Sequence, residues 1–82
     1  MTEIVDVHLG RRLRQRRRLL HLTQSDLAAT CGVGFQQIQK YECATHRISA
    51  AMLWRLAGAL GVGTQYFYEG LDSEASAEQR VA

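Results

Sequence analysis

The side chains best suited to chemistry in this sequence are cations and amides that bind phosphate groups and the edges of nucleic-acid bases. Residues 8–47 carry eight Lys and Arg side chains against two acids, a local charge of +6, although the net charge of all 82 residues is +2. A basic segment of this kind suits a polyanionic partner, with nucleic acid the first choice and an acidic membrane surface the second. A solvated helix face would explain this charge equally well. The spacing of the residues is therefore needed to distinguish a binding surface from a solvated one.

Catalytic and metal-binding chemistry has no matching pattern in the chain. The three histidines and two cysteines lack the spacing of zinc ligands. No nucleophile, base and acid occur in a catalytic arrangement, and Gly32-x-Gly34 and Gly61-x-Gly63 serve as helix boundaries rather than as phosphate-binding loops. We therefore expect no enzyme activity, no metal, no cofactor and no small-molecule ligand.

Length and composition predict one soluble domain. A chain of 82 residues, of which 46% are hydrophobic and 22% charged, is ordinary for a single globular unit. No apolar run is long enough to span a membrane, and the first ten residues lack the apolar core of a secretory signal. Cys31 and Cys43 do not make a disulfide framework. We expect a cytoplasmic protein with reduced thiols, with Cys31 in the core and Cys43 in a loop.

Hydrophobic spacing predicts an all-α fold of five short helices joined by glycine turns. The expected helices cover about residues 7–20, 23–31, 35–42, 50–60 and 65–69. We divide the chain into a lead-in at 1–8, a domain at 9–70 and a polar tail at 71–82, and we expect the tail to be disordered.

Helix boundaries are marked by caps and glycines. Thr23 and Asp26 resemble a capping box at the start of the second helix, and Ser49 and Thr64 are the expected N-caps of the fourth and fifth. Gly32 and Gly61 can take the left-handed conformation that ends a helix.

The second and third helices predict a helix-turn-helix unit. Two helices that cross this closely need a small residue at the crossing, which Ala28 provides, and a turn free of the Cβ penalty, which Gly32 provides four residues later. Ile38 and Tyr41 then face the core, so the opposite side and the N-terminal end of the third helix remain for solvent or for a groove.

On these residues the stretch Leu9 to Gly70 resembles the phage-repressor-like helix-turn-helix domain of the Cro and xenobiotic-response-element group. The matching residues are Thr23-Gln24, Leu27-Ala28, Gly32-Val33, Ile38, Glu42, Leu56-Ala57 and Ala59-Leu60-Gly61-Val62. Two positions depart from the pattern. Ala44 replaces the usual glycine, so we expect that turn to be made differently, and Gly34 replaces the usual Ser or Thr that opens the third helix.

Arg17 and Glu42 break the apolar pattern of their helices. Arg17 continues the inward stripe of Leu9 and Leu13, and Glu42 continues that of Ile38. Because a lone buried charge is costly, two inward charges of opposite sign are best explained as partners. The resemblance implies the same pair, which either sets the pose of the third helix or serves only packing.

The resemblance also implies DNA contacts. The N-terminal end of the third helix enters the major groove in this motif, where Gln pairs with adenine, Lys with guanine and an aromatic ring with a thymine methyl. Phe35 could equally pack against the domain surface. One to three of the first helix's other arginines should contact phosphate, with the rest solvated. The predicted base-reading residues are Phe35, Gln36, Gln37 and Lys40, and the predicted phosphate contacts are Arg14, Gln24, Gln39 and Arg47, with solvent an alternative for Gln24 and Gln39.

The aromatic residues near the fourth and fifth helices predict a dimer. A domain this small usually reads DNA as a two-fold dimer, although the same residues could instead complete the monomer core. The predicted interface residues are Trp54, Tyr66, Tyr68 and Leu71. The sequence as a whole predicts a dimeric regulator, a repressor before an activator, that binds a palindromic operator in double-stranded DNA. The alternative is a protein-binding antitoxin or adaptor that uses the same fold.

Overall fold

The structure is a computed structural model that describes residues 3–72. Those residues form four α-helices and one 3₁₀ helix, and none of them lies in a strand. The elements are α1 (Ile4–Leu19), α2 (Gln24–Cys31), α3 (Phe35–Glu42), α4 (Ala50–Leu60) and η1 (Thr64–Tyr68). The all-α prediction is confirmed, whereas the predicted fifth α-helix is wrong in type.

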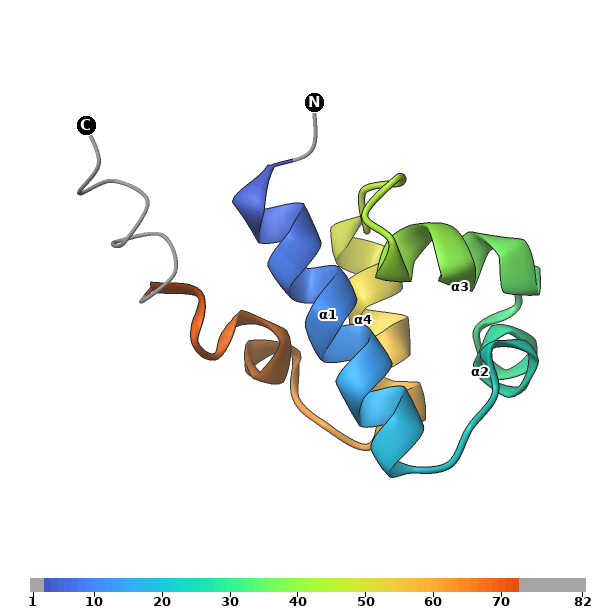
Figure 1. Cartoon of the computed structure of the whole chain (residues 1–82). Helices are drawn as coiled ribbons and strands as arrows, with labels where there is room; N and C mark the ends of the chain where they lie inside the picture. The colour runs from blue at the N-terminus through green and yellow to red at the C-terminus, as the bar shows by residue number, and fades with distance from the viewer. Residues whose placement is uncertain (1–2, 73–82) are drawn as a thin grey trace.

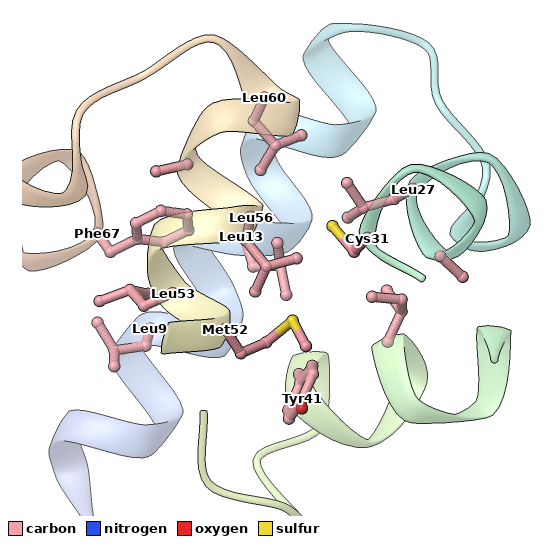
Figure 2. Close-up of a cluster of buried hydrophobic side chains, with 13 residues drawn as sticks. Leu9, Leu13, Leu27, Cys31, Tyr41, Met52, Leu53, Leu56, Leu60 and Phe67 are labelled. Atoms are coloured by element: carbon pink, nitrogen blue, oxygen red, sulfur yellow. The ribbon is translucent and has the colours of Figure 1, made fainter. Parts of the chain in front are cut away.

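The helices pack around one apolar core. In Figure 1, α1 and α4 lie alongside each other, α2 and α3 lie on one side of them, and η1 lies on the other side. Leu13, Ile38, Leu56 and Phe67 have no exposed surface, and Figure 2 shows the buried side chains converging from every helix and from η1. Cys31 belongs to this core as predicted, and burial raises the pKa of its thiol.

The first helix begins earlier than predicted. α1 starts at Ile4 rather than near residue 7, with Glu3 as its N-cap residue. Val5 packs against the core, so the apolar stripe of α1 extends one turn upstream of Leu9. The helical segment therefore takes in most of the predicted lead-in.

The helix-turn-helix forms as its residues predict. The Thr23 hydroxyl accepts from the Asp26 N–H over 3.0 Å, and the Asp26 carboxylate accepts from the Thr23 N–H over 2.9 Å, which completes the capping box. Gly32 takes φ +72° and ends α2, and Ala28 is buried at the crossing. Gly34 is the N-cap residue of α3 but supplies no side-chain hydrogen bond.

The turn after α3 holds an alanine in the left-handed conformation that favours glycine. Ala44 has φ +61°. The N–H groups of Ala44 and Thr45 donate to the carbonyls of Tyr41 and Lys40 over 3.1 and 2.9 Å. These bonds hold an alanine in a conformation that costs an L-residue about 1–2 kcal/mol.

The C-terminal segment departs most from prediction. η1 begins at Thr64, so Thr64 does not cap it; Gly63 is the N-cap residue and Glu69 ends the segment with extended backbone. Five residues between these limits are too few for a stable α-helix, and 3₁₀ geometry is common in such short connections. Phe67 is fully buried as predicted. The predicted tail at 71–82 lies outside the described residues, except for Leu71 and Asp72.

Candidate nucleic-acid interface

The outer side of α3 carries residues predicted to contact DNA, with Gln36 and Lys40 expected to read bases and Gln39 expected to contact phosphate. Gln36, Gln39 and Lys40 are exposed, whereas Ile38 and Tyr41 are buried. The Phe35 side chain stands at the first position of the helix and remains 47% exposed. α3 therefore presents amide, ammonium and aromatic groups together on one surface, which are the groups suited to base edges.

A histidine joins this surface from the loop after α3. The Gln37 Nε2 atom lies 3.4 Å from the His46 Nδ1 atom, and both side chains are on the surface side of the helix. His46 is not among the predicted site residues. Helical periodicity cannot place a loop residue, and the left-handed turn at Ala44 is what folds the chain back over α3.

Arg17 and Glu42 form a bidentate ion pair between α1 and α3. The Arg17 Nε atom donates to Glu42 Oε2 over 2.6 Å, and Nη2 donates to Oε1 over 3.0 Å. The two side chains are only 10% and 4% exposed. Arg17 Nη1 also donates to the Leu22 carbonyl over 2.8 Å. Its hydrogen bonds to Glu42 raise the pKa of Arg17 although burial opposes this, so the guanidinium stays charged.

Gln24, in the first turn of α2, forms a hydrogen bond with the Arg17–Glu42 pair. The Gln24 Nε2 atom donates to Glu42 Oε1 over 3.2 Å, so its amide is turned toward Glu42. One network therefore joins α1, α2 and α3. The Asp26 carboxylate also lies at this helix start, and the hydrogen bond from the Thr23 backbone lowers its pKa. The dipole of α2 would attract a phosphate to the N-terminus of the helix, but the carboxylate of Asp26 would repel it.

Two arginines of α1 hold the C-terminal segment rather than pointing into solvent. Arg12 Nε donates to the Tyr66 carbonyl over 3.0 Å, and its Nη2 pairs with Glu69 Oε1 over 2.8 Å. Arg16 Nε donates to the Leu60 carbonyl over 3.0 Å. Arg12 and Arg16 are therefore not among the solvated arginines expected on this helix, because their side of α1 faces the ends of α4 and η1.

The same stripe of α1 extends to a buried histidine. His8 is 4% exposed, and its Nε2 atom lies 2.7 Å from the Glu69 carbonyl. His8, Arg12 and Arg16 recur every four residues, so they share one helix face. Arg14 and Arg18 lie on other faces and are exposed. Arg14 therefore remains available for the phosphate contact predicted for it.

Arg47 is paired with acids from the start of α1. Its Nη2 atom lies 3.3 Å from Asp6 Oδ2 and 3.5 Å from Glu3 Oε1, while the Arg47 side chain is 66% exposed. The predicted phosphate contact therefore has intramolecular partners. Hydrophobic spacing does not reveal them, because it assigns residues 1–8 to a lead-in without a role.

The four residues predicted to form the dimer interface differ in how exposed they are. Trp54 is 72% exposed on α4, and Tyr68 is 46% exposed at the end of η1. Tyr66 is half-buried, packs edge-on against Phe67, and lies under the Arg12 guanidinium at 3.8 Å from the ring centroid. Leu71 is half-buried. Tyr66 thus belongs largely to the monomer, whereas Trp54 and Tyr68 offer free apolar surface.

Comparison with known proteins identifies the family. A family model described as helix-turn-helix matches residues 13–67, which include α2, α3, α4 and most of η1. The chain belongs to the phage-repressor-like helix-turn-helix family. Part of α1, Ile4–Arg12, precedes the matched residues and is the portion that contacts Arg47 through Asp6.

Relatives of this helix-turn-helix chain include regulators and repressors. An uncharacterized transcriptional regulator in the ATPase CF(0) region of Rhodospirillum rubrum is 53% identical over 68 residues, covering 83% of this chain and 63% of its own length. The chain spans about half to 63% of the length of the curated relatives it matches.

Two solved structures share both fold and sequence similarity with the chain. The restriction-modification controller protein C.AhdI from Aeromonas hydrophila is 28% identical with a TM-score of 0.72, covering 74% of this chain and 92% of its own. The P22 c2 repressor in complex with a synthetic operator is 29% identical with a TM-score of 0.70, covering 76% and 94%.

Residues 3–72 of this helix-turn-helix chain offer neither a metal site nor a membrane span. That part of the protein contains no cluster of three or more His, Cys, Asp or Glu side chains arranged to hold a metal ion. Within the same residues, every helix is too short or too polar to cross a membrane.

Proposed function

We propose that this chain is a sequence-specific, DNA-binding transcriptional regulator that acts as a repressor and binds a palindromic operator as a homodimer. The observation that carries the proposal is the exposed face of α3, where Gln36 and Lys40 stand outward from a helix fixed by a buried ion pair. The P22 c2 repressor, which shares this fold, is known in complex with an operator.

The pose of α3 is the basis of base reading in this proposal. A recognition helix must lie in the major groove at an angle that keeps its side chains within reach of the base edges. The Arg17–Glu42 pair fixes the C-terminal end of α3 against α1, and Gln24 links that end to α2. A charged network that spans three helices is therefore suited to hold the exposed face in one orientation.

Selection of bound fragments from random DNA tests the function directly. We expect recovery of one palindrome with half-sites about 10 base pairs apart, centre to centre, because two recognition helices related by a two-fold axis read successive turns of the major groove. If no sequence is enriched, sequence-specific regulation is rejected in favour of a protein-binding role for the same fold.

Substitutions on α3 and α1 should separate base reading from phosphate contact. We expect Gln36→Ala to lose about 1–3 kcal/mol at one or two operator positions and to relax the base preference there. Arg14→Ala should instead weaken binding to all duplexes alike and make the salt dependence shallower by about one unit. Titration of operator and point-mutated operators at several salt concentrations measures both. A uniform loss for Gln36→Ala across unrelated duplexes would argue against base reading.

The dimer is proposed to form through the exposed apolar residues of α4 and η1. One open groove is lined by residues of α4, of η1 and of the turn between them, including Trp54, Gly58, Val62, Thr64 and Gln65. Tyr68 is exposed at the last position of η1, and Leu71 is half-buried after it. A second copy is the occupant proposed here, because one helix-turn-helix reads too few base pairs to find a single site in a genome.

Tyr68→Asp tests this interface with little risk to the fold. The Tyr68 side chain is 46% exposed, whereas Tyr66 is fixed by Arg12 and Phe67 and is less suitable for substitution. We expect Tyr68→Asp to weaken self-association by about 1–3 kcal/mol while the melting temperature stays near that of the wild type. Sedimentation velocity measures the change. A wild-type chain that remains monomeric at all concentrations, with one protein per operator, would remove the dimer and the palindrome together.

A further inference from the structure

The start of α1 lies against the loop that follows α3. Because α1 begins at Ile4, its first turns precede the residues matched by the family model, 13–67. These turns carry Asp6, and Glu3 is their N-cap residue. Both acids reach Arg47, which lies in the loop between α3 and α4.

The two partners of the Asp6–Arg47 contact differ in how deeply they are buried. Asp6 Oδ2 lies 3.3 Å from both Nε and Nη2 of Arg47, so one carboxylate oxygen faces two donors of the guanidinium. The Asp6 side chain is 10% exposed, whereas the Arg47 side chain is 66% exposed. The acid is therefore held in place by its surroundings, and the arginine is the partner that can move away.

We propose that Asp6, assisted by Glu3, is an intramolecular competitor for the DNA phosphate that Arg47 binds. The inference rests on the proposed function, in which Arg47 contacts the backbone beside α3. When two N–H donors of a guanidinium face a carboxylate, fewer donors remain for a phosphate, and the carboxylate offsets part of the positive charge. A phosphate must displace Asp6 before it can take the Nε and Nη2 donors of Arg47, so the free protein binds DNA less tightly than it would without this contact.

The opposite role for Asp6 makes the opposite prediction. If Asp6 positioned Arg47 for phosphate, removing its charge would weaken DNA binding. If it competes, Asp6→Asn strengthens binding to any duplex by about two- to fivefold at low salt, the range expected for a partly exposed ion pair. Glu3→Gln should act in the same direction and by less, because Glu3 is 66% exposed and lies 3.5 Å from Arg47.

Five proteins test the inference against a random-sequence duplex and the selected operator. They are the wild type, Asp6→Asn, Arg47→Ala and the double variant, with Asp72→Asn as a control for loss of one exposed acid elsewhere. We expect Asp6→Asn to tighten binding only where Arg47 is present. In the absence of DNA, the ¹⁵N resonance of Arg47 Nε should also shift in Asp6→Asn and stay in place in Asp72→Asn.

Each other outcome overturns the inference. Equal tightening by Asp6→Asn in the Arg47→Ala background, or by Asp72→Asn, would assign the effect to net charge. Weaker binding by Asp6→Asn would assign Asp6 a positioning role. A wild-type protein that binds no duplex would reject the proposed function and the competition with it, whereas a wild type that binds DNA and is unaffected by Asp6→Asn would reject the competition alone.

Discussion

Arg17→Met is expected to destabilise the protein by about 3–5 kcal/mol, because it leaves the Glu42 carboxylate buried without its ion-pair partner. Glu42→Gln is expected to act similarly, since it leaves the guanidinium of Arg17 buried. The loss is large compared with the total stability of a small domain, about 5–15 kcal/mol. Urea unfolding followed by circular dichroism at low temperature measures it, and DNA binding is not needed for the measurement.

A matched control separates the ion pair from the helix. Arg14→Met makes the same chemical change three residues earlier in α1, at an exposed position. Arg and Met have similar helix propensities, so we expect a change within about 0.5 kcal/mol. If Arg17→Met and Arg14→Met unfold at the same urea concentration, the charge pair is not buried in solution.

Replacing both members of the pair should recover much of the loss. In Arg17→Met with Glu42→Leu no unpaired charge remains at this site, and well-packed apolar residues often substitute for a buried ion pair at little cost. Recovery will be incomplete, because the Leu22 carbonyl and the Gln24 amide each lose a hydrogen-bond partner. The size of the remaining loss measures how far the pair also stabilises the turn before α2.

The sequence predicts the parts of this fold whose signals are local. The capping box at Thr23, the left-handed Gly32 and the limits of α3 all follow from residues within a few positions of each other. The Arg17–Glu42 pair is long-range, but each member breaks an apolar stripe on its own helix. Inward charges of opposite sign can therefore be matched from the sequence alone.

The features that the sequence does not predict depend on contacts between distant segments. Nothing near Arg12 or Arg16 indicates that they donate to the carbonyls of Tyr66 and Leu60, because a backbone acceptor has no signature in the sequence. The Asp6–Arg47 contact is likewise long-range, and Arg47 lies in the loop between α3 and α4, where no helical stripe marks it as the partner of Asp6. Ala44 shows a further limit, since tertiary packing and two backbone hydrogen bonds override the local preference of alanine.

Gly10→Ala is expected to destabilise the protein, although helix propensity alone predicts that replacing glycine by alanine inside a helix stabilises it. A Cβ atom at Gly10 would lie 2.5 Å from the Tyr41 carbonyl oxygen and 2.9 Å from that of Glu42. Both obstacles are backbone, so α1 and the end of α3 would have to move apart. We expect a loss of about 1–3 kcal/mol, the usual range for overpacking in a close-packed interior.

Gly58→Ala is the control that separates the close packing at Gly10 from the general effect of replacing glycine by alanine in a helix. Gly58 also lies inside a helix, α4, but an added Cβ atom there meets no heavy atom within 4 Å apart from its chain neighbours and the backbone of its own helix. We expect it to stabilise the protein by about 0.5–1 kcal/mol, the ordinary gain from replacing glycine by alanine in a helix. Gly58 lines the groove proposed for the dimer, so the comparison is made at a protein concentration where the chain is monomeric. Urea unfolding of the two variants should then give midpoints on opposite sides of the wild type. Stabilisation by Gly10→Ala would mean that α1 and α3 do not approach this closely, and the angle at which α3 is held would have to be revised.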